Sequence, residues 1–150
     1  MQSLRYVILG YGGIAGSHVD SYGKLPDVTP AGFVDIDEAA LKRAKERFPN
    51  AEVDTDVERL LAKVRPDLAS VCTPNRVHAS LTLAALRAGC HVLCEKPMAM
   101  TLEEATGMEA ARAKAGKLGA INFSYRNVPA FRFAREVLRA GEGGAKASIG

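Results

Sequence analysis

Cysteine is scarce in this chain of 150 residues, and long apolar runs are absent from it. The three cysteines, Cys72, Cys90 and Cys94, lack the spacing of secreted disulfide frameworks, which argues against a fold held by disulfides. No stretch approaches the roughly 18 consecutive apolar residues of a membrane span. The start of the sequence also lacks a charged segment followed by an apolar one. We therefore expect a cytoplasmic protein with no membrane partner.

An excess of either charge is also nearly absent. Residues 1–124 contain 15 basic and 15 acidic side chains, so the whole net charge of +3 lies in residues 125–150. A basic end raises the question of a nucleic-acid partner. The arginines within residues 125–150, however, share one face of a predicted helix whose other face is apolar, and no nucleic-acid-binding motif accompanies them. A solvated helix face is the favoured interpretation, and no nucleic-acid partner is expected.

Apolar residues make up 47% of the chain, which suffices for the core of one domain. Short apolar runs alternate with segments of helical periodicity. The predicted strands cover residues 6–9, 31–34, 51–53, 67–72, 91–95 and 118–123. The predicted helices cover residues 14–25, 38–48, 57–62, 75–89, 101–115 and 129–140. Strands separated by such helices pair in parallel, so we expect an α/β fold with a doubly wound parallel sheet and helices on both faces.

Clustered glycines directly follow the first predicted strand. Gly10 would permit a tight turn, Gly12 would let the backbone approach a pyrophosphate, and Ala15 would let the helix pack close to the strand. The phosphates would then lie on free N–H groups at the positive end of that helix. The alternative is an ordinary tight turn. The candidate dinucleotide contacts in this segment are Gly10, Tyr11, Gly12, Gly13 and Ile14.

Asp35 ends the second predicted strand, about 20 residues past the glycine turn, where a carboxylate can accept hydrogen bonds from an adenosine ribose. Its charge would repel a 2′-phosphate, which predicts NAD as the cofactor rather than NADP. The alternative is an acid that caps the following helix.

Ligands of doubly wound sheets bind beyond the carboxyl ends of the strands. This rule selects residues 10–15, Asp35, residues 73–75 and residues 95–97. A rigid turn after the fourth strand could line the nicotinamide half of a cofactor, although it could equally be a helix start capped by Asn75. A lone histidine such as His78 is more often packed than ligand-binding. The further candidate cofactor contacts are Cys72, Thr73, Pro74, Asn75, His78, Glu95, Lys96 and Pro97.

Lys96 is the candidate catalytic residue, because it follows a buried strand at this edge. A positive nicotinamide ring nearby would favour its neutral amine, which can exchange a proton with a sugar hydroxyl. The alternatives are a plain donor to a substrate oxygen, or a surface lysine paired with Glu95. A metal site is not expected, because strand alternation places His91 on the face opposite to Cys90 and Cys94.

Four segments together resemble one known family: the glycine turn of residues 10–15, Asp35, residues 72–78 and residues 95–99. They are similar to the N-terminal domain of the glucose–fructose oxidoreductase, inositol 2-dehydrogenase and rhizopine catabolism (Gfo/Idh/MocA) family. The Glu-Lys-Pro element is the most specific of them, and the resemblance covers about residues 4–140.

The resemblance implies a Rossmann-like domain of an NAD(P)-dependent oxidoreductase that acts on a sugar, polyol or related hydroxy compound. It assigns Lys96 a catalytic and substrate-orienting role, and it implies a Lys96–Pro97 peptide that is often cis. Members of the family continue into an α+β domain that supplies substrate contacts. Residues 1–122 would then be the dinucleotide-binding domain, and residues 123–150 the junction to a substrate domain that this chain lacks.

On this interpretation the 150 residues are incomplete for catalysis, and the alternative is a non-catalytic dinucleotide-binding or regulatory module. The predicted helix of residues 129–140 carries Phe131, Ala134 and Leu138 on one stripe. Without a covering domain this stripe would be exposed. We therefore expect a homo-oligomer, or residues 141–150 disordered with the helix packed against another copy.

Overall fold

A six-stranded parallel sheet organises residues 3–141, which are the residues that the computed structural model describes. The strand order is β3-β2-β1-β4-β5-β6, which is the Rossmann order and confirms the predicted doubly wound α/β fold. The strands are β1 (Leu4–Leu9), β2 (Val28–Val34), β3 (Glu52–Asp54), β4 (Leu68–Val71), β5 (His91–Cys94) and β6 (Gly119–Ile121).

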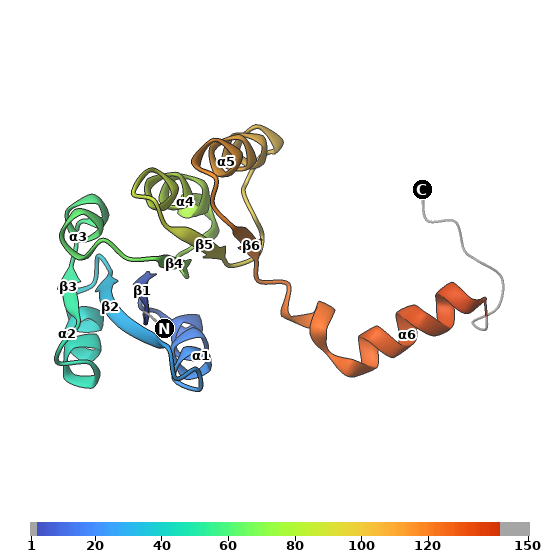
Figure 1. Cartoon of the computed structure of the whole chain (residues 1–150), viewed down its shortest axis with the longest axis horizontal. Helices are drawn as coiled ribbons and strands as arrows, with labels where there is room; N and C mark the ends of the chain where they lie inside the picture. Colours follow the sequence, from blue (N-terminus) through green and yellow to red (C-terminus); the bar gives the residue numbers. More distant parts are fainter. Residues whose placement is uncertain (1–2, 142–150) are drawn as a thin grey trace.

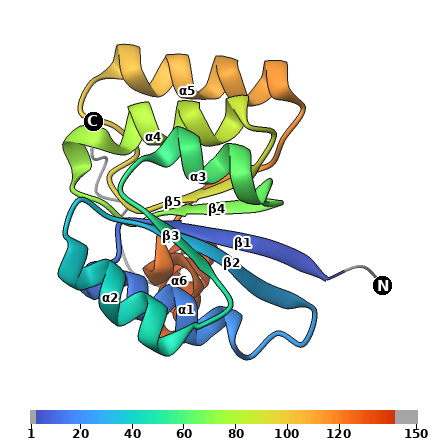
Figure 2. The ribbon, with the colours of Figure 1, turned by 90° about the vertical axis from the view of Figure 1, so that its left-hand side faces the viewer.

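Helices cover both faces of the sheet. In Figure 2, α3, α4 and α5 lie on one face, and α1 and α2 lie on the other. The α-helices are α1 (Gly13–Tyr22), α2 (Glu38–Arg47), α3 (Val57–Val64), α4 (His78–Arg87), α5 (Leu102–Ala115) and α6 (Pro129–Ala140). Two 3₁₀ turns, η1 (Asn75–Val77) and η2 (Ser124–Asn127), precede α4 and α6. No helix within residues 3–141 has the length and apolar character needed to cross a bilayer.

The alternation of side chains along β1 builds a core on each face of the sheet. Val7 and Leu9 belong to the cluster that includes residues of α3, α4 and α5. Tyr6 and Ile8 belong to the second cluster, with residues of α1 and α2. Burying each of the larger apolar side chains contributes about 1.5–3 kcal/mol, so the two cores hold the sheet edge in a fixed geometry.

Side chains cap three of the six α-helices within residues 3–141. The side chains of Asp37, Asp56 and Thr101 accept backbone N–H bonds at the starts of α2, α3 and α5. The prediction for Asn75 was wrong, because no side chain caps η1 or α4, and α4 begins three residues later at His78. The first helix ends at Tyr22 rather than at residue 25, since Gly23 follows it as the C-cap.

The last helix stands apart from the sheet. Figure 1 shows α6 projecting away from the other helices, and its contacts are chiefly with η2. Phe131, Phe133 and Leu138 are 57%, 69% and 61% exposed. All three residues of the predicted apolar stripe, Phe131, Ala134 and Leu138, are exposed. The expectations for residues 142–150 lie outside the described residues.

Candidate functional site

A cavity of about 300 Å³ opens beyond the carboxyl ends of the strands. The neighbouring strands β1 and β4 continue to helices on opposite sides of the sheet, which makes the space beyond them the expected ligand crevice. The cavity is lined by Leu9, Gly10, Gly12, Val34, Asp35, Ile36, Thr55, Val57, Cys72, Thr73, Pro74, Arg76, Val77, Ser80 and Leu81.

The glycine turn between β1 and α1 has two different requirements. Gly10 has a φ of +91°, and a Cβ added there would lie 2.7 Å from Thr73 Cγ2 and 3.0 Å from the Cys72 backbone. Only glycine fits this close approach of two chain segments. A Cβ added at Gly12 or Gly13 would meet nothing within 4 Å, so this part of the turn borders open space.

The start of α1 has no capping side chain and no acidic residue in its first turn. The first N–H groups of a helix have no partners within the helix, and the helix dipole makes this end electropositive. Aspartate or threonine side chains cap this end in α2, α3 and α5, whereas α4, like α1, has no side-chain cap. The uncapped end of α1 can therefore receive an anion.

Asp35 leaves β2 beside the glycine turn. Its Oδ2 accepts from the Tyr11 N–H at 2.6 Å, and its Oδ1 accepts from the Asp37 N–H at 2.9 Å. These bonds fix the carboxylate at the wall of the cavity. Each oxygen has a second lone pair, so the group can still accept bonds from neighbouring hydroxyls. Tyr11 itself packs edge-on against Phe33, with ring centroids 5.0 Å apart.

The segment after β4 forms the opposite wall. Burial, with smaller effects from Glu95 and Cys94, raises the pKa of the Cys72 thiol to about 12, so Cys72 lines the cavity as an uncharged thiol. Thr73 Oγ1 is buried and has no hydrogen-bond partner within residues 3–141. Because a buried hydroxyl without a partner is unfavourable, this atom is a position where a ligand group could bind.

His78 is buried and connects two loops. Its Nε2 lies 2.9 Å from the Thr73 carbonyl oxygen, and its Nδ1 lies 2.8 Å from the Pro97 carbonyl oxygen. The side chain is fully enclosed, with 0% exposure. The structure therefore packs His78 behind the cavity wall rather than in the wall itself.

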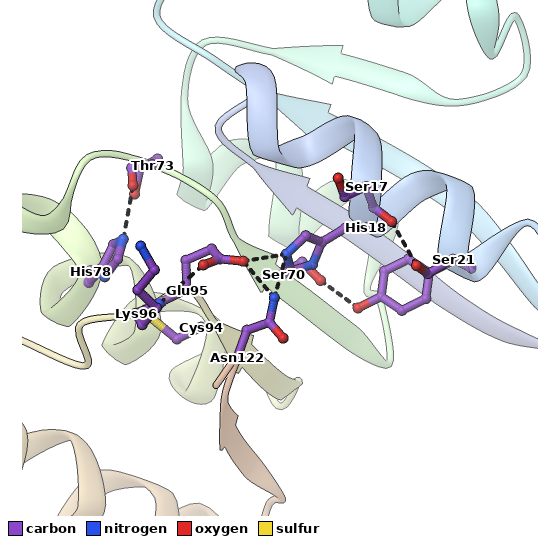
Figure 3. Close-up of polar contacts among 11 residues, drawn as sticks. Ser17, His18, Ser21, Ser70, Thr73, His78, Cys94, Glu95, Lys96 and Asn122 are labelled. Atoms are coloured by element: carbon purple, nitrogen blue, oxygen red, sulfur yellow. Dashed lines mark hydrogen bonds and ion pairs between the residues drawn. The ribbon is translucent and has the colours of Figure 1, made fainter. Parts of the chain in front are cut away.

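A buried polar cluster surrounds Glu95 at the end of β5 (Figure 3). Its Oε1 accepts from His18 Nε2 at 2.9 Å and from Asn122 Nδ2 at 2.6 Å, and its Oε2 accepts from the Lys96 N–H at 3.2 Å. Burial acts to raise the pKa of Glu95, but these hydrogen bonds outweigh it, and the pKa is lowered. The carboxylate thus joins α1, the end of β5 and the end of β6.

Lys96 is exposed and lies between His78 and Glu95 in Figure 3. The Glu95 carboxylate bonds to His18 and Asn122, so the surface ion pair with Lys96 that the sequence left open is not formed. Among the described residues, no side-chain hydrogen bond or ion pair holds Lys96 Nζ. The Lys96–Pro97 peptide is cis, as the family resemblance implied.

The sequence-predicted residues separate into groups. Six of them line the cavity together, namely Gly10, Gly12, Asp35, Cys72, Thr73 and Pro74. Gly13, Ile14, Asn75, Lys96 and Pro97 are exposed near the same sheet edge. The buried His78 and Glu95 are hydrogen-bonded to other parts of the protein.

Sequence reasoning missed His18 and Asn122 as the partners of Glu95. The helical spacing of His18 from Ala15, which puts both on the buried side of α1, was a usable signal. Within residues 3–141, no group of three or more histidine, cysteine, aspartate or glutamate side chains is placed to hold a metal ion.

Comparison with known proteins places this fold in a family. Residues 4–123 match the oxidoreductase family with an NAD-binding Rossmann fold, Gfo/Idh/MocA. The structure is also similar to the WlbA dehydrogenase of Chromobacterium violaceum, solved with NADH and UDP-GlcNAcA. The TM-score is 0.89 at 28% identity, over 96% of this chain and 42% of that one.

Among curated relatives, the chain is 41% identical to D-glucoside 3-dehydrogenase of Escherichia coli over 82% of its own length and 35% of the relative's. It is 34% identical to the NADP(+)-dependent scyllo-inositol 2-dehydrogenase IolW of Bacillus subtilis, over 79% of its length and 32% of the relative's. The chain thus spans about a third of the length of these enzymes. Because the family model matches residues 4–123, and the glycine turn opens onto the same crevice as Asp35, the chain belongs to the Gfo/Idh/MocA oxidoreductase family.

Proposed function

We propose that this chain is the NAD-binding part of a dehydrogenase that moves hydride between nicotinamide and a carbon bearing a hydroxyl group in a sugar or polyol. The observation that carries the proposal is the uncapped start of α1, which faces the same crevice as the Asp35 carboxylate. The two features suit the pyrophosphate and the ribose of one dinucleotide. The dehydrogenase relatives support the oxidoreductase chemistry.

The chain's residues fit a dinucleotide in three places. Gly12 and Gly13 border open space into which a Cβ would project, so a pyrophosphate could approach the backbone there. Asp35 would accept hydrogen bonds from the adenosine ribose hydroxyls, which favours NAD over NADP by repelling a 2′-phosphate. The unpaired Thr73 hydroxyl would donate to the bound nucleotide from the opposite wall.

Lys96 is the residue that we assign to the chemical step. Nicotinamide, when bound, would supply the hydride acceptor or donor. The exposed amine of Lys96 would lie beside the substrate hydroxyl, accept its proton as the carbon loses hydride, and return it in the reverse direction. Because no described side chain pairs with Nζ, the amine is free to make this contact.

The division of labour along the chain is part of the proposal. Residues 1–122 would form the dinucleotide-binding domain, and residues 123–150 would form the junction to a substrate-binding domain. The curated relatives are about three times as long as this chain's match to them, which leaves room for such a domain in those proteins. The substrate and any second copy of the chain would meet the crevice from that side.

Calorimetric titration of the chain with NAD and with NADP tests the cofactor assignment. We expect saturable binding of both, with NAD the tighter ligand. Single-turnover reduction of NAD by a panel of polyols then tests catalysis. Binding without reduction, in a protein that also carries a substrate domain, would favour the alternative of a non-catalytic dinucleotide-binding module. Failure to bind either nucleotide would overturn the proposal.

A further inference from the structure

Two buried histidines from different elements contact the segment that carries Lys96. His18 lies on α1 and is 5% exposed, and His78 begins α4 and is 0% exposed. One contacts the residue before Lys96, and the other contacts the residue after it. Neither imidazole lines the cavity beyond the strand ends. Their positions suggest a role that acts through the segment between them.

The His18 contact acts on the first residue of this segment. His18 Nε2 lies 2.9 Å from Glu95 Oε1, and Asn122 Nδ2 lies 2.6 Å from the same oxygen. The other oxygen, Oε2, accepts from the backbone N–H of Lys96 at 3.2 Å. The orientation of the Glu95 carboxylate, which His18 helps to fix, therefore also constrains the peptide that carries Lys96.

The His78 contact acts on the last residue of the segment. Nδ1 lies 2.8 Å from the Pro97 carbonyl, and Nε2 lies 2.9 Å from the Thr73 carbonyl. A carbonyl oxygen only accepts hydrogen bonds, so the ring must donate in each contact, and an imidazole with a single N–H donates in one of them at a time. Through this ring, the Lys96 turn is connected to the cavity wall at Thr73; Figure 3 shows the contact between His78 and Thr73.

We propose that His18 and His78 are positioning residues that together hold the segment from Glu95 to Pro97 and thereby set where Lys96 lies relative to a bound dinucleotide. The dinucleotide part of this inference rests on the proposed function. The holding of the turn rests only on the contacts described above.

Amide substitutions can keep or remove a single donor at each position. The side-chain nitrogen of asparagine lies near the position of histidine Nδ1, and that of glutamine lies near Nε2. His18→Gln therefore keeps the donor to Glu95, and His18→Asn removes it. At position 78 the order is reversed for the Lys96 turn: His78→Asn keeps the donor to Pro97 and loses that to Thr73, whereas His78→Gln loses the donor to Pro97 and keeps that to Thr73. Because asparagine loses the donor to the turn at one position and keeps it at the other, an effect of the amide type alone would run in opposite directions at the two positions.

Hydrogen exchange of the Lys96 backbone N–H, measured by NMR without nucleotide, tests the holding of the turn. We expect exchange about 5–10-fold faster in His18→Asn and His78→Gln than in the matched His18→Gln and His78→Asn, as the loss of one hydrogen bond implies. The Ile8 amide in β1 reports on global stability and should not differ within a pair. Equal Lys96 exchange within both pairs, or a parallel change at Ile8, would overturn the inference.

Acetylation of Lys96, followed by mass spectrometry with and without NADH, tests the second part. We expect NADH to slow modification of the wild-type lysine, with several-fold weaker protection in His18→Asn and His78→Gln at saturating NADH. Equal protection in all four variants would contradict a positioning role. If the wild-type chain does not bind NADH, the proposed function fails, and the exchange rates still decide whether the histidines hold the turn.

Discussion

At the scale of single residues, carboxylates in this protein have different surroundings and therefore different roles. Asp35 is partly exposed at the cavity wall and accepts two backbone N–H bonds. Glu95 is buried and accepts from two side chains and one backbone N–H. Both were predicted as cofactor contacts because both follow strands at the same edge. Only the surroundings in the fold separate a carboxylate that can face a ligand from one that organises the protein.

Asp35→Ala should narrow the preference for NAD over NADP by about tenfold or more, which corresponds to roughly 1.4 kcal/mol. The substitution removes the charge that would repel a 2′-phosphate. Calorimetric dissociation constants for both nucleotides measure the effect. Asp37→Ala is the matched control, because it also removes a negative charge close to the turn. Asp37 caps α2 and, unlike Asp35, does not line the cavity. An unchanged preference in Asp35→Ala would refute the assignment of Asp35 to the ribose.

Glu95→Gln should destabilise the fold at neutral pH by about 1–3 kcal/mol, the range for poorly satisfied buried groups. The pKa of Glu95 is lower in the folded protein than its ordinary value of 4.5, so its ionised form contributes stability above that pH. This contribution is lost as the pH falls below 4.5 and through the folded-state pKa. Urea unfolding should show that the difference in free energy of unfolding between the wild type and Glu95→Gln becomes smaller from pH 7 to pH 3. A constant difference would contradict the hydrogen-bonded ionised carboxylate.

Lys96→Ala should leave NAD binding within a few-fold and slow hydride transfer by about 10²–10⁴ in a protein that carries both domains, as expected for an acid–base group. Single-turnover absorbance of the reduced nicotinamide measures the step. Lys96→Arg is the control, because guanidinium keeps the charge but does not release a proton in this pH range. Turnover at the wild-type rate in Lys96→Ala would show that Lys96 takes no part in the chemical step.

At the scale of elements, the turn between β1 and α1 contains neighbouring glycines with opposite requirements. Gly10 is left-handed and tightly packed against the segment after β4, whereas Gly12 has ordinary backbone angles and borders open space. A sequence motif represents both as the same letter. The structure distinguishes a glycine required by folding from one required by a ligand.

Gly10→Ala should therefore destabilise the domain, by about 1–2 kcal/mol for the left-handed backbone alone and further for contacts of 2.7–3.0 Å with Thr73 and Cys72. Gly12→Ala, the matched substitution two residues away, should leave the free energy of unfolding nearly unchanged but weaken NAD binding about tenfold or more, because its Cβ would occupy the approach to the pyrophosphate. Chemical denaturation and calorimetry separate the two effects. The reverse pattern would show that the roles of the two glycines have been exchanged.

The elements themselves could be predicted because their signals are local. Apolar runs and clustered glycines lie next to the structures they specify. The Glu95 cluster could not be predicted in this way, because His18 is 77 residues away in sequence and Asn122 is 27 residues away. Their meeting depends on the order of β1, β5 and β6 in the folded sheet. The Asn75 prediction failed for a local reason, because Asn75 itself begins a 3₁₀ turn and does not directly precede α4.

At the scale of the whole molecule, the core is well covered on both faces of the sheet, but α6 is not. The exposed side chains of Phe131, Phe133 and Leu138 lie on a helix whose contacts with the rest of residues 3–141 are chiefly with η2. Tyr125 of η2 packs near Phe131, with ring centroids 5.7 Å apart, and is itself 74% exposed. Phe131 and Leu138, seven residues apart on one side of the helix, thus form an exposed apolar surface with Tyr125 beside it, and Phe133 is exposed on another side of the helix.

We expect the chain to self-associate through this surface at tens of micromolar, because each buried phenylalanine can contribute about 1.5–3 kcal/mol. Sedimentation velocity should show a concentration-dependent increase in mass for the wild type and a monomer for the double variant Phe131→Ser, Leu138→Ser. Leu102→Ser, which removes an even more exposed apolar side chain from the start of α5, should associate like the wild type. Association should also slow hydrogen exchange in α6, since packing against a second copy would cover the helix. A wild-type chain that stays monomeric while α6 is strongly protected would refute the prediction, because the helix would then be covered by its own domain.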